Sequence, residues 1–245
     1  MKNIRTVITL ILNILIVVFA CIGIYKMVTF TGEGSGLTST GIENFKYFTV
    51  LSNVFAGVVS LVWLVFFAMK KTFPVLPKLM AASSVGLTFL IIAAFLAPLY
   101  PDLNLYEGGN LWFHLILPLT AMLEFVLLDT SDTVVNNKAA IESQDNPKEN
   151  IRKKKAADRK KRIPFRYTFI SASLALLYGI GYMVNILING IGVWPETNDW
   201  YGFLNWGWTV GFVIFGFIVL MDWGIACLLR FLNRLKTGDG SPSEK

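Results

Sequence analysis

A hydroxyl and an imidazole, those of Thr49 and His114, are the groups in this chain best suited to nucleophilic chemistry. A threonine hydroxyl becomes a useful nucleophile only when a base accepts its proton within roughly 2.6–3.2 Å. His114 is the only histidine in the sequence, so imidazole chemistry near neutral pH is possible only there. It lies in an apolar stretch, where an ionisable side chain usually faces a bundle interior or a wet cavity. Function therefore depends on what lies opposite His114.

The composition indicates that membrane helices position these two residues. Of the 245 residues, 54% are hydrophobic and 16% are charged, and the mean hydropathy is +0.57, whereas soluble domains are about 25% charged. A helix needs about 20 apolar residues to cross a bilayer. We predict one all-α integral membrane domain over residues 1–245, a bundle of six transmembrane helices at about 5–29, 46–69, 79–100, 110–129, 165–189 and 203–230.

Positive charge gathers in alternate connections of this predicted bundle. Lysine and arginine precede the first helix, separate the second from the third and follow the sixth: Lys2, Arg5, Lys70, Lys71, Lys78, Arg230, Arg234, Lys236 and Lys245. A heavier basic run over 152–166 lies in the later part of the connection predicted at about 130–164. The opposite connections carry mostly acidic residues: Glu33, Glu43, Asp102, Glu107, Glu196 and Asp199. The positive-inside rule then places both termini in the cytoplasm, in the cell membrane, and we expect a bacterial inner membrane.

The net charge of +6 does not point to nucleic acid, because most of the excess lies beside predicted membrane helices. We expect the basic connection to contact anionic membrane lipids. A specific acidic protein partner is an open alternative without a supporting motif.

Thr49 and His114 are predicted to lie at the same depth. The second and fourth helices both enter from the outer face, and each residue lies about four positions into its helix, or about 6 Å below the start. Ser52 and Asn53 follow Thr49 on one face of the second helix, and polar residues there face protein rather than lipid. Pro118 follows His114 by one turn and frees its carbonyl from the usual helical hydrogen bond.

Other polar side chains are expected at a similar level, near the outer ends of the fifth and sixth helices. The candidates for pocket lining or for oxyanion stabilisation are Ser52, Asn53, Tyr182, Asn185 and Asn205. Each also has a structural interpretation. The asparagines often form interhelical hydrogen bonds, and a membrane threonine such as Thr49 often bonds the carbonyl one turn back.

Two carboxylates, Glu124 and Asp222, lie in the inner part of the fourth and sixth helices. One interpretation is that Lys70 or Arg166 pairs with them near the interface. The alternative is an ion-coupled or proton-coupled carboxylate site.

Neither a disulfide nor a cofactor is predicted. Cys21 and Cys227 lie in different helices, and no metal-ligand spacing occurs. The residues before Cys21 faintly resemble a lipoprotein cleavage site, so lipidation there is an alternative in which the first helix would be a removed signal.

Two segments also resemble a known family. Phe45-Lys46-Tyr47-Phe48-Thr49-Val50-Leu51-Ser52-Asn53 and His114-Leu115-Ile116-Leu117-Pro118-Leu119 are similar to the androgen-induced and androgen-dependent TFPI-regulating membrane proteins, with this chain nearer to their bacterial relatives. The resemblance implies a six-helix intramembrane hydrolase acting on fatty acid esters of hydroxy fatty acids. Thr49 would be the nucleophile and His114 the base. The Ser52-Asn53 pair and the heavy basic run depart from the characterised animal members, so the resemblance does not define the physiological ester.

The sequence therefore supports two hypotheses. The first is a hydrolase that cleaves a lipid-like ester near the outer leaflet with Thr49 and His114. The second is a non-enzymatic carrier or receptor, in which the same outer cavity binds a ligand and Glu124 with Asp222 couples it to ions. The absence of an obvious internal repeat favours the enzyme.

Overall fold

The computed structural model is helical throughout its regular elements. It describes residues 2–29, 41–99, 101–102, 104–127, 163–193 and 197–238. The α-helices are α1 (Lys2–Val28), α2 (Phe48–Ala68), α3 (Val75–Ile91), α4 (Ala97–Leu99), α5 (Gly109–Leu111), α6 (Leu117–Leu127), α8 (Arg166–Asn189) and α9 (Trp208–Gly238). A 3-10 helix, η1 (Gly41–Lys46), precedes α2, and two π-helical segments, η2 (Ile92–Leu96) and η3 (Trp112–Ile116), join α3 to α4 and α5 to α6.

Within the part of the chain that the structure describes, six helices are long and apolar enough to cross a membrane, which confirms the six-span prediction. The third span begins at Val75 rather than near residue 79. Lys78 was predicted in a cytoplasmic connection, and that placement is wrong, because it lies in the first turns of α3 with 3% of its surface exposed. Pro77 does not interrupt this start, since the first turn of a helix needs no intrahelical N–H donor. Most of the basic connection lies outside the described residues.

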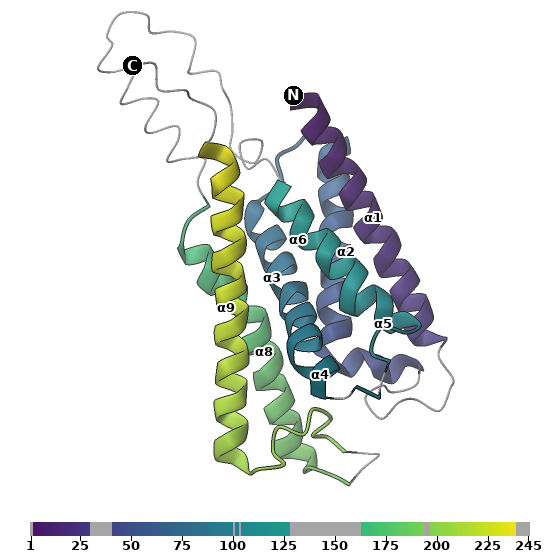
Figure 1. Ribbon diagram of the computed structural model, residues 1–245, viewed down its shortest axis with the longest axis vertical. Helices are drawn as coiled ribbons and strands as arrows, with labels where there is room; N and C mark the ends of the chain where they lie inside the picture. The colour runs from purple at the N-terminus through teal and green to yellow at the C-terminus, as the bar shows by residue number, and fades with distance from the viewer. Residues whose placement is uncertain are drawn as a thin grey trace, which may run out of the picture.

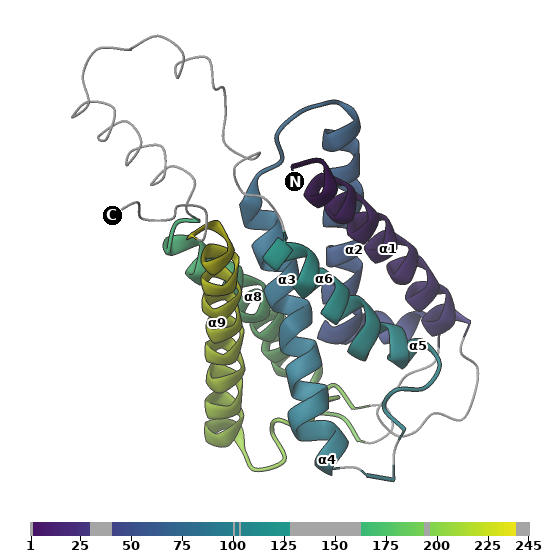
Figure 2. The same ribbon diagram turned by 45° about the horizontal axis from the view of Figure 1, so that its top comes forward.

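Helix α3 occupies the centre of the bundle and packs against α2, α6, α8 and α9. Helices α1 and α2 lie on one side of it and α8 and α9 on the other (Figures 1 and 2). Its buried middle is rich in small side chains, which allow helix backbones to approach closely inside a membrane. These are Ala81, Ala82, Ser83, Ser84 and Gly86.

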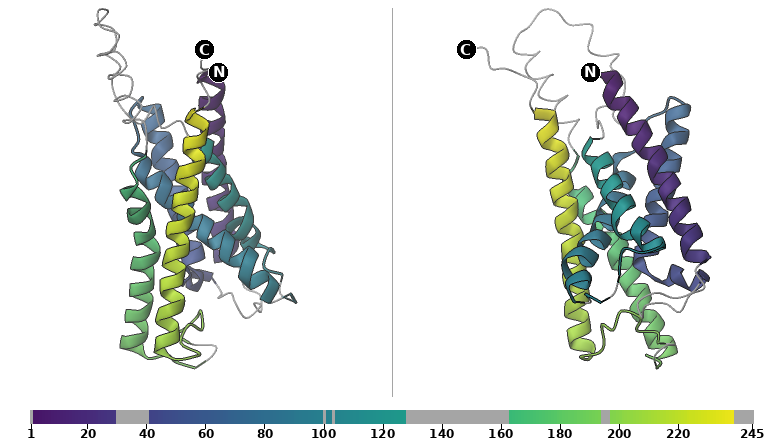
Figure 3. Two further views of the ribbon diagram at one scale, coloured as in Figure 1. Left: turned by 60° about the vertical axis from the view of Figure 1, so that its left-hand side comes forward. Right: turned by 45° about the vertical axis from the view of Figure 1, so that its right-hand side comes forward.

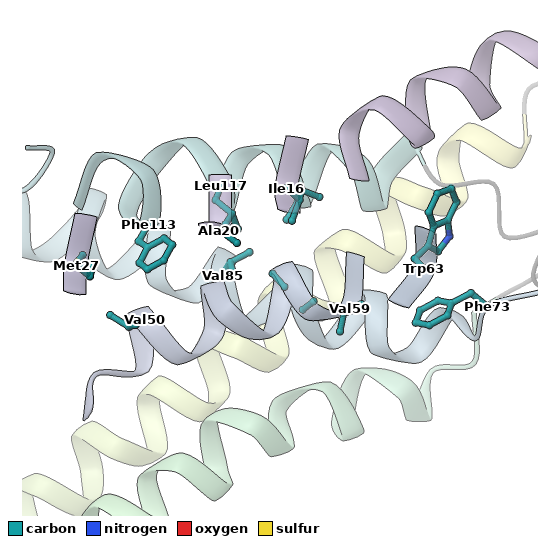
Figure 4. Close-up of a cluster of buried hydrophobic side chains, with 13 residues drawn as sticks. Ile16, Ala20, Met27, Val50, Val59, Trp63, Phe73, Val85, Phe113 and Leu117 are labelled. Atoms are coloured by element: carbon teal, nitrogen blue, oxygen red, sulfur yellow. The ribbon is translucent and has the colours of Figure 1, made fainter. Parts of the chain in front are cut away.

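Apolar packing holds η3 against α1 and α2. Phe113 is fully buried in a cluster with Ile16, Ala20 and Val50 (Figure 4). A side chain at Gly23 would place its Cβ 2.2 Å from the Phe113 ring, so only glycine admits the ring at that position. The segment that carries His114 is therefore fixed against the first two spans.

The start of α1 and the end of α9 lie at the same end of the bundle (Figure 1). The elements α4 and α5 and the connection between α8 and α9 lie toward the opposite end, and α8 and α9 run side by side (Figure 3). The candidate residues Thr49 and His114 belong to this second end, because α2 begins there and η3 follows α5 directly.

Candidate functional site

Thr49 and His114 line one cavity of about 610 Å³. Its walls come from η1, the start of α2, the α4–α5 connection, η3 and the connection between α8 and α9. Polar side chains in the wall include Asn44, Asn110 and Asn205. Residues from spans two and four, distant in sequence, thus line the same partly open cavity.

His114 is held in one orientation by a backbone carbonyl. It is 7% exposed, and its Nδ1 lies 2.6 Å from the carbonyl oxygen of Leu105. A carbonyl only accepts hydrogen bonds, so Nδ1 carries the hydrogen and the neutral ring keeps its free lone pair on Nε2. This tautomer is the one a general base requires when Nε2 receives the proton.

The π-helical turn of η3 sets the position of His114 along the fourth span. The Leu117 N–H donates to the carbonyl of Trp112 five residues earlier. Pro118 has no N–H to offer the His114 carbonyl, which favours a locally widened turn. Such π-helical turns are frequent at functional sites.

The Thr49 hydroxyl makes no hydrogen bond to any described residue. The hydroxyls of Thr120 and Thr168, in contrast, donate to carbonyls of the preceding turn at 2.7 and 2.8 Å. Thr49 is the second residue of α2, so the α-helix itself has no preceding turn to supply such a carbonyl. Its backbone N–H lies in the first turn of α2, where amide groups are expected to lack an intrahelical acceptor and the helix dipole is positive.

No hydrogen bond joins Thr49 to His114 in the described structure. Proton transfer between them therefore needs a bridging water or a side-chain rotation, as is common in unliganded hydrolytic sites. The arrangement supplies a free hydroxyl, a ring with a defined tautomer and a first-turn N–H around one space.

A second cavity of about 510 Å³ adjoins the first and is mainly apolar. The two cavities share four lining residues: Thr49, Ile92, Leu96 and Tyr201. Leu87, Phe95 and Phe217 continue the apolar wall between α3, α8 and α9. The π-helical η2 supplies Ile92 and Leu96. Thr49 thus lies where a cavity of mixed lining, the more polar of the two, meets a mainly apolar one.

Ser52 and Asn53 line neither cavity, and their side chains instead donate hydrogen bonds to the backbone of Thr49. The Asn53 amide donates to the carbonyl of Thr49 at 2.7 Å and to that of Phe113 at 3.0 Å. The Ser52 hydroxyl donates to the Thr49 carbonyl at 3.1 Å and lies 3.2 Å from the Thr88 hydroxyl. Asn53 therefore ties the backbone of the hydroxyl-bearing residue to the residue before His114.

The connection between α8 and α9 is pinned to the start of α2. The Phe48 N–H donates to the Tyr201 hydroxyl at 2.8 Å, and the Tyr178 hydroxyl donates to the Lys46 carbonyl at 2.5 Å. Burial raises the pKa of Tyr201 well above its ordinary value. Tyr201 is therefore a neutral phenol at neutral pH, able to accept this N–H as a helix cap.

The predicted pocket residues of the last two spans separate into different roles. Tyr182 lines the apolar cavity and donates to Asp199, whose carboxylate also accepts the N–H groups of Phe203 and Leu204 at 3.0 and 2.9 Å. Asn205 lines the more polar cavity. Asn185 lines neither cavity.

Glu124 is paired differently from the expectation. Its carboxylate lies 3.3 Å from the Lys78 ammonium and accepts the Asn13 amide at 2.8 Å. Neither Lys70 nor Arg166 is its partner, because α3 begins early enough to bring Lys78 inside the bundle. Asp222 is fully buried, and neither of its oxygens has a hydrogen-bond partner among the described residues.

Three parts of this site have little sequence signal. The Leu105 carbonyl orients His114, yet a backbone carbonyl is common to every residue type. Asn110 lines the cavity, although an asparagine at the start of a span is often only a helix cap. Tyr201 accepts the Phe48 N–H, although an aromatic residue in a connection between spans is often only an interfacial anchor.

No protein-family profile, curated protein or solved structure matches this chain. Its function is therefore argued from the geometry of the site, and the family resemblance of the Thr49 and His114 segments stays a prediction.

Proposed function

We propose that this protein is an intramembrane hydrolase that cleaves a lipid-like carboxylic ester, with Thr49 as nucleophile and His114 as base. The observation that carries the proposal is the position of Thr49, where a cavity of mixed polar and apolar lining, which includes His114, meets a mainly apolar cavity. An amphipathic ester has the same division, because its acyl chain is apolar and its ester linkage is polar. Substrate sites typically combine an apolar wall with a few placed polar groups.

The chemistry proceeds through an acyl-enzyme. Thr49 Oγ1 attacks the ester carbonyl while His114 Nε2 accepts the hydroxyl proton, and the Leu105 carbonyl stabilises the resulting imidazolium through Nδ1. The tetrahedral oxyanion is stabilised by the first-turn Thr49 N–H and by an amide of Asn110 or Asn205. Collapse expels the alcohol, which takes its proton from His114. Water then attacks the acyl-threonine with His114 again as base and releases the acid.

We also propose the orientation of the chain in the cell membrane. The start of α1 and the end of α9 lie at one end of a six-span bundle, and basic residues flank the spans at that end, so the cytoplasm is assigned there. The hydrolytic site then lies toward the outer leaflet of what we take to be a bacterial inner membrane. The basic connection contacts anionic lipid head groups on the cytoplasmic side. Membership of the androgen-induced family remains part of this proposal.

The test is covalent labelling and ester turnover by the purified full chain. Wild-type protein should react with a fluorophosphonate probe and hydrolyse a chromogenic acyl ester. Thr49→Ala should abolish both, and His114→Ala should lower both by roughly 10²–10⁴-fold. Thr49→Ser should keep measurable labelling because it retains a hydroxyl.

Thr120→Ala is the matched control, since this threonine hydroxyl bonds within its own helix and lines neither cavity. It should leave labelling unchanged. An inert wild type that still binds a fatty-acid ester would contradict hydrolysis and favour the carrier hypothesis. Labelling that survives Thr49→Ala would assign the nucleophile elsewhere.

A further inference from the structure

Asp222 is a buried carboxylate that the proposed hydrolysis does not use. It lies in α9, fully buried, and among the described residues neither carboxylate oxygen has a hydrogen bond of ordinary geometry, although the Ser83 hydroxyl lies close by. It lines neither of the two cavities described above. An ionised carboxylate left in a dry interior without a partner is strongly unfavourable, so such a group needs a proton or a cation to compensate its charge.

The surroundings of Asp222 offer neutral oxygen ligands. Helix α9 packs there against both α3 and α8. The hydroxyl of Ser83 on α3 is a neighbouring polar group, and it lies 2.7 Å from the hydroxyl of Ser171 on α8. Both serines are fully buried. Asp222 on α9, Ser83 on α3 and Ser171 on α8 thus form a chain of buried oxygen groups in which Ser83 lies next to the other two.

The buried cation on α3, Lys78, is already paired with another carboxylate. Lys78 forms its ion pair with Glu124 at 3.3 Å and donates to Asn13 and Ser60. Asp222 therefore does not share in this ion pair, and its charge must be balanced from outside the described side chains.

We propose that Asp222, Ser83 and Ser171 form a binding site for a small monovalent cation such as Na⁺. Hard cations prefer carboxylate, hydroxyl and carbonyl oxygens. One carboxylate with two neutral hydroxyls carries a single negative charge, so a monovalent ion leaves the buried site neutral. A divalent ion would leave an uncompensated charge in the membrane interior. The bound ion would link α3, α8 and α9, the helices that also form the apolar cavity.

The test is the thermal stability of the purified full chain in detergent, compared in NaCl and in choline chloride at equal ionic strength. A ligand that binds only the folded state raises the melting temperature, and a tenfold excess of Na⁺ over its dissociation constant should raise it by about 3–6 °C. Asp222→Asn and Ser83→Ala should remove this sodium response. Asp102→Asn, at an exposed carboxylate, should keep it.

An infrared difference spectrum gives a second measurement that a purely structural role would not produce. Adding Na⁺ to wild type should shift a carboxylate stretching band, and Asp222→Asn should lose that shift. If Asp222→Asn does not fold, Ser83→Ala and Ser171→Ala carry the comparison. A wild type equally stable in both salts, or a sodium response that persists in the Ser83 and Ser171 variants, would overturn the proposal.

Discussion

At the scale of single residues, the site depends on side chains that never touch the cavity. Asn53 is the clearest case, because one amide group joins the Thr49 carbonyl to the Phe113 carbonyl. The polar stripe on the second span predicted an inward-facing asparagine. Whether it would face a ligand or another helix depended on how closely η3 approaches α2.

Asn53→Ala should destabilise the protein by about 1–3 kcal/mol, because it removes a buried amide that donates to the carbonyls of Thr49 and Phe113. It should also reduce fluorophosphonate labelling, since the hydrogen bonds that hold the backbone of Thr49 near that of Phe113, the residue before His114, are lost. Thermal unfolding in detergent and labelling rates measure the two effects. Asn185→Ala is the matched control and should change stability by less than about 0.5 kcal/mol. Equal behaviour of the two variants would show that these hydrogen bonds are unimportant.

The buried Lys78–Glu124 ion pair joins α3 to α6. Hydrogen bonds to Asn13 on α1 and Ser60 on α2 connect it to two further helices. Lys78→Met or Glu124→Leu alone should cost about 3–5 kcal/mol by stranding a buried charge. The double variant should recover most of that loss. A double-mutant cycle of unfolding free energies tests this, with Lys70→Met, at an exposed lysine, as a neutral control. Simple additivity of the two losses would contradict the pairing.

At the scale of elements, two π-helical segments shape the walls of the cavities. Each ends two residues before a proline, Pro98 after η2 and Pro118 after η3. A proline withholds the N–H that would close an α-helical turn at that point. The sequence predicted that Pro118 leaves the His114 carbonyl without its helical hydrogen bond. In the structure the helix responds with a π-helical turn, whose hydrogen bonds join residues five apart, rather than with a simple kink.

Pro118→Ala should restore the missing N–H and favour regular α-helix through η3. Removing one π turn rotates the preceding residues by about 100° relative to α6, which moves His114 away from the cavity. We expect unchanged or higher thermal stability together with roughly 10²-fold slower ester turnover. Pro77→Ala, in the first turn of α3, should alter neither quantity. Full activity in Pro118→Ala would show that the π-helical turn is not needed to position His114.

At the scale of the whole molecule, six spans place the start of α1 and the end of α9 at one end of the bundle and the candidate site toward the other (Figure 1). The charge distribution then predicts which end faces the cytoplasm.

Cysteine labelling on intact cells tests this orientation in a background with Cys21 and Cys227 replaced by alanine. Asp102→Cys, in the α4–α5 connection, should react with a membrane-impermeant maleimide. Thr72→Cys, in the α2–α3 connection, should react only after the membrane is permeabilised. The reverse pattern would invert the bundle and move the proposed site to the cytoplasmic side.

Sequence by itself determined the number of spans and most of their limits, because the length and hydropathy of a membrane helix are local properties. It also singled out Thr49 and His114, since their residue types limit where such chemistry can occur. It placed Lys78 wrongly in an exposed connection. A lysine is expected to be solvent-exposed unless a buried partner is known, and its partner Glu124 is distant in sequence. Only the tertiary structure decided that the Leu105 carbonyl orients His114, that Thr49 lies between two cavities and that Asp222 is buried beside Ser83 rather than beside a described cation. Each of these depends on which helices meet, and such contacts join residues whose separation along the chain carries no local signal.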